Sequence, residues 1–103
     1  MASTAQVTVR FKSTTRVYAV GIDMNKLKFR SGTAKTNVTV GDRHVLQWVV
    51  RGVPGTKFEV SIQADKGFVV LPKKVFSKPI KKTISQSKIK TGSVLFKVGV
   101  DKD

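Results

Sequence analysis

The side chains that could act as acids, bases or metal ligands are few and lie far apart in the sequence. The chain has one histidine, His44, and no cysteine. Its six acidic residues are Asp23, Asp42, Glu59, Asp65, Asp101 and Asp103. Hydrolysis by paired carboxylates needs two acids at one site, and a metal centre needs several ligands close together. Asp42 and Asp65 stand in glycine-containing turns, where aspartate accepts hydrogen bonds from its own backbone. We therefore predict no catalytic residues, no metal site and no cofactor.

Sequence motifs that build a reactive site are missing as well. The chain has no Gly-x-Ser-x-Gly turn for a nucleophilic serine. It has no glycine-rich loop of the kinds that hold phosphates or dinucleotides. We expect His44 to begin a strand next to the turn at Gly41. The sequence therefore indicates a protein that is not an enzyme.

Positive charge is the strongest chemical signal in the sequence. Twenty lysine and arginine residues face six acids, so the formal net charge at pH 7 is +14. Such a charge attracts polyanions, including nucleic acids, acidic glycans and anionic surfaces. No acid lies between Lys66 and Val100, where the lysines are densest. The predicted polyanion-binding residues are Lys73, Lys74, Lys78, Lys81, Lys82, Lys88 and Lys90.

The kind of basic residue limits what this surface can recognise. Lysine outnumbers arginine, and arginine is favoured for bidentate contacts with phosphates and bases. We therefore expect diffuse, salt-sensitive binding with little sequence preference. A row of Lys26, Lys28 and Arg30 on one strand face is a second cationic candidate. The lysine-rich stretch also has a structural explanation, because lysines and prolines on an edge strand prevent aggregation between sheets.

The basic residues lie in and between segments that we predict to be β-strands. Apolar and polar residues alternate with a period of two, the spacing of a half-buried strand, and the apolar set is rich in residues that favour strands. The alternating segments lie at 7–12, 17–22, 26–30, 38–40, 46–50, 57–63, 80–85 and 94–100. We predict an all-β fold, an antiparallel immunoglobulin-like β-sandwich of seven to nine strands, with a small β-barrel as the alternative.

Glycine-containing segments predict hairpins between neighbouring strands. A three-residue loop over 41–43 would pair the strands on either side and place Val38 opposite Leu46. Residues 65–67 have the composition of a second hairpin turn.

Proline marks other breaks in the chain. Pro54-Gly55 has the residues of a type II turn. Residues 68–71 are apolar throughout, which predicts a strand covered on both faces. Pro72 and Pro79 then enclose a loop or an edge strand.

Aromatic residues bear on nucleic-acid binding, since single strands bind where rings are exposed among cations. We assign to the core the four phenylalanines that share a face with aliphatic neighbours, which are Phe11, Phe29, Phe58 and Phe96. Phe68 and Phe76 fit either place, and Tyr18 could present its hydroxyl at a rim. A platform that stacks bases requires exposed aromatic rings between cationic side chains, and this alternation is mostly missing from the sequence.

One segment resembles a known class of module. Trp48 in an apolar strand, the Pro54-Gly55 turn and the strand at 57–62 resemble the early strands of fibronectin type III and related immunoglobulin-like modules. Residues 89–98 resemble the later part of the same pattern, so that about half the chain is covered. Trp48 comes later than in those modules, after two or three extra strands. The resemblance implies sandwich architecture and no particular activity.

We predict one domain over 6–100, with a flexible N-terminal tail at 1–5 and a C-terminal tail at 101–103. No apolar run approaches the length of about 20 residues that spans a bilayer. Small residues near the start, Ala2, Ser3 and Ala5, are common near signal cleavage sites and favour a secreted or periplasmic location over a cytoplasmic one.

The functional prediction is a non-catalytic binding or surface module whose basic face attracts an acidic polymer or protein. One alternative is a basic nucleic-acid-binding β domain without sequence specificity. The other is a structural or assembly subunit in which an exposed strand edge pairs with another chain.

Overall fold

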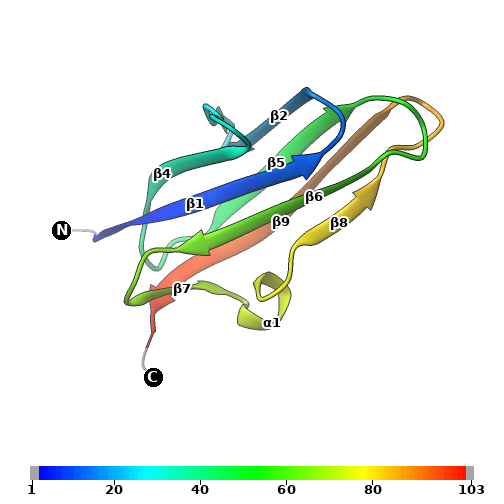
Figure 1. Ribbon diagram of the computed structural model, residues 1–103. Coiled ribbons are helices and arrows are strands. Elements are labelled where there is room, and N and C mark those ends of the chain that lie inside the picture. Colours follow the sequence, from blue (N-terminus) through cyan, green and yellow to red (C-terminus); the bar gives the residue numbers. More distant parts are fainter. Residues whose placement is uncertain (1–2, 102–103) are drawn as a thin grey trace.

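The computed structural model describes residues 3–101, which form nine strands and one helical turn (Figure 1). In chain order the elements are β1 (Thr4–Ser13), β2 (Val17–Ile22), β3 (Asn25–Lys26), β4 (Thr33–Thr39), β5 (His44–Arg51), β6 (Lys57–Ala64), β7 (Phe68–Leu71), α1 (Lys73–Phe76), β8 (Ile80–Thr83) and β9 (Ile89–Val100). The strand number lies within the predicted range. Within residues 3–101, no helix has the length and apolar character that crossing a bilayer requires.

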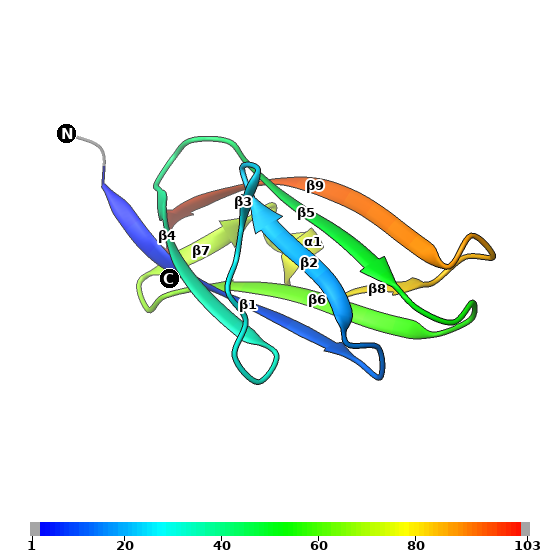
Figure 2. The same cartoon turned by 90° about the horizontal axis from the view of Figure 1, so that it is seen from above.

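The strands form two antiparallel sheets that pack face to face (Figures 1 and 2). The four-stranded sheet has the order β4-β1-β6-β8, and the five-stranded sheet has the order β3-β2-β5-β9-β7. The sheets do not close into a barrel, so the barrel alternative is wrong. The predicted all-β class is confirmed, and the charged side chains stand on the outer faces and edges of two layers.

Nearly every connection leads from one sheet to the other, and only β2 and β3 are consecutive strands that pair. The predicted hairpin over 41–43 is therefore wrong, because β4 pairs with β1 and Val38 lies opposite Ala5. The hairpin over 65–67 is also wrong, because β6 and β7 belong to different sheets. Alternation tells which side of a strand is buried. Both sheets bury one side, so alternation cannot tell which strand is the neighbour.

The core lies between the sheets and contains the large residues that alternation assigned to it. Trp48, Phe58 and Phe96 are 4%, 1% and 2% exposed. The ring of Phe11 is buried beside Phe58, with ring centroids 5.8 Å apart. Burying a large apolar side chain stabilises a fold by about 1.5–3 kcal/mol. These rings, contributed by both sheets, therefore hold the two layers together.

Two predictions for the stretch 68–79 are wrong. β7 is an edge strand that pairs only with β9, and Leu71 is exposed, so the apolar segment is not covered on both faces. The residues after Pro72 form the helical turn α1 rather than a loop or an edge strand. The carbonyl of Pro72 accepts hydrogen bonds from the N–H groups of Val75 and Phe76, which closes this turn.

The predicted turn at Pro54-Gly55 is confirmed. Gly55 has a φ of +92°, and the N–H of Thr56 donates to the carbonyl of Val53 at 3.1 Å. Glycine adopts this backbone conformation without steric cost, so the β5–β6 connection turns sharply here.

The folded domain begins earlier than predicted. β1 starts at Thr4 and Ala5 is buried, so the last two residues of the predicted N-terminal tail belong to the sandwich. Asp101 follows β9 and is exposed. The other tail residues, at 1–2 and 102–103, lie outside the described residues.

The two ends of the sandwich are built differently. The chain enters and leaves at one end, and three connections meet at the other (Figures 1 and 2). We call these connections, residues 14–16, 52–56 and 84–88, the loop end. The molecule measures 44 × 24 × 22 Å along its principal axes, so charges gathered at one end are well separated from those at the other.

Candidate anion-binding site

Five of the seven predicted polyanion-binding lysines follow one another along an open edge. Lys73 and Lys74 belong to α1, Lys78 follows it, and Lys81 and Lys82 lie in β8, the edge strand of the four-stranded sheet. All five are exposed. We call them the lysine strip. A strand that ends a sheet with exposed lysines is also protected against sheet-to-sheet pairing.

The structure separates the other two lysines from this strip. Lys88 lies in the β8–β9 turn with a φ of +67°. Lys90 lies in β9, in the other sheet, opposite the buried Val50. The second cationic row is not formed, because β3 ends at Lys26 and the lysine and arginine that follow it lie outside any strand.

A shallow hollow on the outer face of the four-stranded sheet gathers cations from three strands. We call it the basic hollow. Its lining residues are Lys12, Ser13, Thr14, Lys57, Phe58, Glu59, Lys81, Lys82 and Thr83. Strand pairing explains the outward part of this set, because Glu59 lies opposite Lys12 on β1 and opposite Lys81 on β8. Lys82 lies opposite the buried Phe58 and lines the hollow from the exposed edge of the sheet. Side chains opposite each other on antiparallel strands share one face of the sheet.

Among the described residues, three of the four lysines in the basic hollow have no acidic partner. Lys81 Nζ lies 3.6 Å from Glu59 Oε1. Within residues 3–101, no carboxylate lies within 4 Å of the ammonium groups of Lys12, Lys57 or Lys82. An ammonium group without a partner attracts a phosphate or sulfate group. The arrangement can therefore bind anions.

The sequence analysis missed Lys12 and Lys57. Both stand at outward positions of alternating segments, which the period of two does show. Their neighbourhood depends on the pairing of β1 with β6 and of β6 with β8, and no local feature of the sequence marks that pairing.

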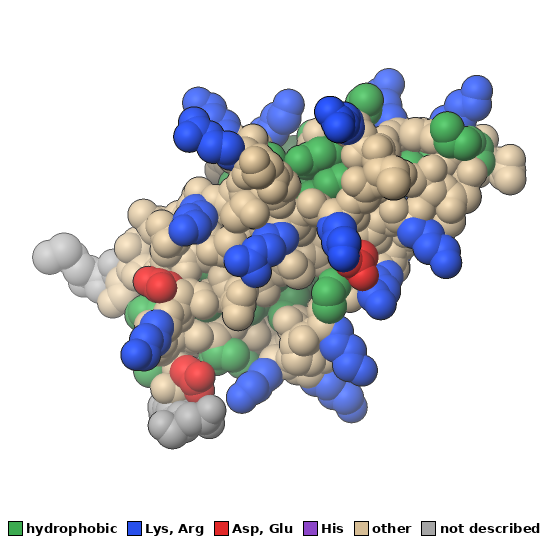
Figure 3. Space-filling view, in the orientation of Figure 1, with side chains coloured by type: hydrophobic (Ala, Val, Ile, Leu, Met, Phe, Trp, Pro, Cys, Tyr) green, Lys and Arg blue, Asp and Glu red, His purple; other side chains and the backbone are tan. Residues whose placement is uncertain are grey.

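Acidic residues collect at the end of the molecule opposite the loop end. Asp42 precedes β5, Asp65 follows β6 and Asp101 follows β9, and these three junctions lie at the end where the termini emerge. Asp23 follows β2 and lies beside Val45, level with the middle of β9. Glu59 is the remaining acid among the described residues. Figure 3 shows lysine and arginine side chains over the face of the four-stranded sheet, with few acidic side chains between them. Apart from Glu59, the described acids therefore lie away from the loop end.

The single histidine is buried and pairs with the exposed side chain of Asp23. His44 is 7% exposed, and its Nδ1 lies 2.6 Å from Asp23 Oδ2. Its Nε2 lies 2.8 Å from the carbonyl oxygen of Thr39. Asp23 Oδ1 accepts a hydrogen bond from the N–H of Val45. Both ring nitrogens face acceptors, so the imidazolium form satisfies every group.

The contact between His44 and Asp23 shifts the pKa values of both side chains. Burial alone would lower the pKa of His44, but the hydrogen bonds to the Thr39 carbonyl and the Asp23 carboxylate raise that pKa above its ordinary value of 6.5. Burial alone would raise the pKa of Asp23, but the hydrogen bonds from His44 and from the Val45 N–H lower that pKa below 3.8. With both ring nitrogens engaged, His44 acts as a structural clamp between the β2–β3 and β4–β5 connections.

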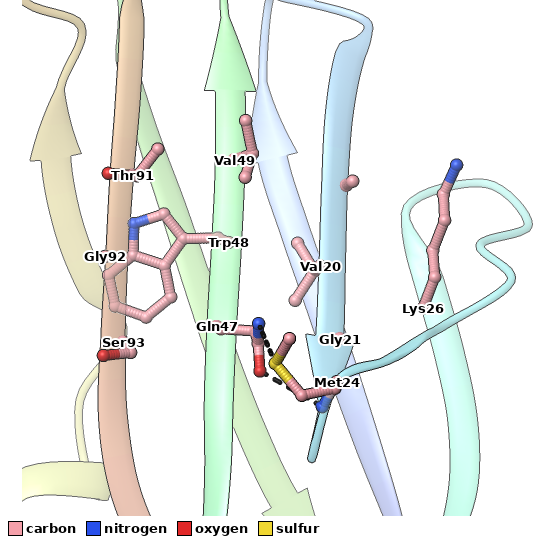
Figure 4. A pocket seen from close by; sticks show the side chains of 11 residues that line it. Val20, Gly21, Met24, Lys26, Gln47, Trp48, Val49, Thr91, Gly92 and Ser93 are labelled. Atoms are coloured by element: carbon pink, nitrogen blue, oxygen red, sulfur yellow. Dashed lines mark hydrogen bonds between the residues drawn. The ribbon is translucent and has the colours of Figure 1, made fainter.

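A second hollow lies across β2, β5 and β9 on the outer face of the five-stranded sheet (Figure 4). Gln47 holds Met24 beside it, because Gln47 Oε1 accepts the Met24 N–H at 3.2 Å and Gln47 Nε2 lies 3.3 Å from Met24 Sδ. Lys26 is the one charged side chain among the described residues that line it. This hollow offers no pair of titratable groups.

Aromatic rings are mostly withdrawn from solvent. Phe11, Phe58 and Phe96 are buried, and Phe29, Phe68, Phe76 and Tyr18 are partly buried against the core. Tyr18 stacks on Phe11 with ring centroids 3.8 Å apart. A platform for stacking bases needs exposed rings, so the described residues do not form one.

The described residues also contain no cluster of three or more histidine or acidic side chains that could hold a metal ion. No family model matches this sequence, and no curated protein and no solved structure is significantly similar to it.

Proposed function

We propose that this protein is a non-catalytic binding module that holds an acidic polymer against the basic hollow and the lysine strip. The observation that carries the proposal is the basic hollow itself, which Lys12 and Lys57 line from outward positions of two strands and Lys82 lines from the edge strand β8, with no acidic partner for any of the three within residues 3–101. The lysine strip continues from the same edge strand. A polymer with repeated sulfate or phosphate groups can engage both at once.

The chemistry of lysine predicts how such binding behaves. An ammonium group is a point charge without the fixed fork of arginine, so it favours negative charge density over a particular sequence. Binding that neutralises phosphates releases counterions, and its affinity falls steeply as salt rises. The module is therefore expected to bind sulfated glycans and nucleic acid by the same surface.

The proposal also includes an architecture, a location and an alternative role. An immunoglobulin-like form of the sandwich is supported by its two antiparallel layers. A secreted or periplasmic location is supported by the small residues near the start of the chain. The assembly alternative is supported by β4, an edge strand of seven residues whose outer side has no partner strand among the described residues.

Charge-matched variants test the proposal. Lys12→Gln/Lys57→Gln/Lys82→Gln lowers the formal net charge from +14 to +11, since 14 − 3 = 11. Lys28→Gln/Lys66→Gln/Lys97→Gln gives the same net charge from exposed lysines away from the hollow. Affinity for a heparin fragment and for duplex DNA is measured at 50 and 200 mM NaCl. The hollow variant is expected to bind about tenfold more weakly than its control and to show a salt slope smaller by about 3 on DNA.

Two results would reject the proposal. Equal losses in the two triple variants would show that net charge alone attracts the polymer. No binding of the unmodified protein at 50 mM NaCl would remove the polyanion from its function altogether.

A further inference from the structure

Exposed apolar side chains stand at the tips of the loop end. Val53, beside the Pro54-Gly55 turn, is 73% exposed, and Val17, at the start of β2, is 61% exposed. Both line a hollow whose other apolar residues are Pro54 and Ile89. Exposing these two valine side chains to water is unfavourable, and transferring them from water into an apolar phase lowers the free energy.

The loops that carry these tips are braced against one another. The N–H of Gly52 donates to the Lys88 carbonyl at 3.1 Å, and the N–H of Gly55 donates to the Ile84 carbonyl at 2.9 Å. The hydroxyl of Thr15 donates to the carbonyl of Arg51. The three connections therefore present their tips as one fixed surface, which lowers the entropic cost of docking.

Cations surround the apolar tips. Arg51 and Lys88 line the same hollow as Val17 and Val53, and Arg16 is exposed next to Val17. Within residues 3–101, neither Arg51 nor Lys88 has an ion-pair partner. The segments 14–17, 51–57 and 83–90 contain no acidic residue. Figure 3 shows apolar side chains at this end, at the upper right, with lysine and arginine side chains beside them.

An apolar tip inside a ring of cations fits the interface of an anionic bilayer. Such an interface offers an apolar layer beneath a layer of phosphates, and peripheral proteins bind it by apolar insertion together with basic residues. A second copy of the chain is disfavoured, because it would bring the same cations to the contact. The termini leave from the opposite end, so neither obstructs an end-on approach (Figures 1 and 2).

We propose that the loop end docks on anionic phospholipid bilayers, with Val17 and Val53 entering the interface and Arg51 and Lys88 contacting the headgroup phosphates. This site goes beyond the proposed function, because it uses apolar insertion and a surface other than the basic hollow. It would hold the module end-on at a membrane and leave the face of the four-stranded sheet open to an acidic polymer.

Vesicle binding with charge-neutral variants tests this site. Sedimentation with phosphatidylcholine vesicles, with and without 30% phosphatidylserine, is measured at 100 mM NaCl. Val17→Ser/Val53→Ser removes the apolar tips, and Leu95→Ser/Val100→Ser removes side chains that are 58% and 60% exposed elsewhere. The unmodified protein is expected to bind only the anionic vesicles. The tip variant is expected to bind them at least tenfold more weakly, the control variant is expected to bind normally, and inorganic phosphate at 1 mM should not compete.

Three outcomes would overturn the inference: no binding to anionic vesicles, an equal loss in the two variants, or full displacement by 1 mM phosphate, which would indicate a site for the free ion. The heparin affinity of the tip variant separates the two proposals. It is expected to equal that of the unmodified protein. Loss of heparin binding in the Lys12→Gln/Lys57→Gln/Lys82→Gln variant therefore tests the basic hollow independently.

Discussion

Replacing His44 with alanine is expected to lower the free energy of unfolding by about 3 kcal/mol at pH 5.5. The substitution removes a buried ring and two hydrogen bonds, one of them to a carboxylate. A neutral hydrogen bond contributes about 1 kcal/mol and one to a charged group about 1.5–3 kcal/mol. Loss of the ring also removes the side-chain link from Asp23 to the Thr39 carbonyl at the end of β4, while the N–H of Asp23 still donates to the carbonyl of Val45.

The same pair sets the pH at which the fold is most stable. The pKa of His44 is higher in the folded chain than 6.5, so its contribution is complete below pH 6.5 and is lost as pH rises through the folded pKa. The pKa of Asp23 is lower in the folded chain than 3.8, so its contribution is complete above pH 3.8 and is lost as pH falls through the folded pKa. Both contributions are present together between these two limits.

Urea unfolding at pH 5.5 and pH 8.5 measures both effects. The unmodified protein is expected to lose stability from pH 5.5 to pH 8.5, and the Asp23→Asn protein is expected to lose much less. Arg43→Ala, an exposed neighbour of His44, serves as the control and should change stability little. A His44→Ala protein within 1 kcal/mol of the unmodified protein at pH 5.5 would show that the pair is not a clamp.

Replacing Gly92 with alanine is expected to cost about 2 kcal/mol. Gly92 lies opposite Trp48 across the β5–β9 pair, and Figure 4 shows the indole lying across β9 at this residue. A Cβ atom on Gly92 would lie 2.5 Å from Cζ2, 2.7 Å from Cε2 and 2.8 Å from Nε1 of Trp48. The indole is 4% exposed and cannot move aside without shifting the core. Overpacking of this kind costs about 1–3 kcal/mol.

A second-site change separates this clash from a general effect on β9. Trp48→Phe shortens the ring and removes Nε1, which is buried without a hydrogen-bond partner among the described residues. Gly92→Ala should therefore cost less in the Trp48→Phe protein, and the two changes should not add. Gly99→Ala in the same strand is the control, because its Cβ would meet only the flexible end of Leu71. A Gly92→Ala protein as stable as the Gly99→Ala protein would rule out the contact.

The residues buried between the two sheets could be predicted from the sequence, because a half-buried strand alternates apolar and polar residues along its own length. The residues around Trp48, Phe58 and Phe96 alternate between apolar and polar, and these three rings are buried as that pattern predicts. The turn at Pro54-Gly55 could be predicted for a similar reason, since its backbone conformation depends on its own two residues.

Strand order could not be predicted, because it depends on partners distant in the sequence. β1 pairs with β4 and β6 and leaves its chain neighbour β2 to the other sheet. The grouping of residues at the basic hollow and the His44–Asp23 pair could not be predicted for the same reason. Lys12 and Lys57 meet at the basic hollow across 45 positions of the chain, and Asp23 meets His44 across 21. All five lysines of the lysine strip could be predicted from the sequence, because α1 and β8 follow each other closely along the chain.

Mapping the amide groups that respond to a short heparin oligosaccharide tests the central claim most directly. With backbone amide NMR signals recorded at 50 mM NaCl, the basic hollow predicts the largest changes at residues 12–14, 57–59 and 81–83. Changes centred on 41–43 and 65–67, beside the acidic end of the sandwich, or spread evenly over both sheets, would contradict it.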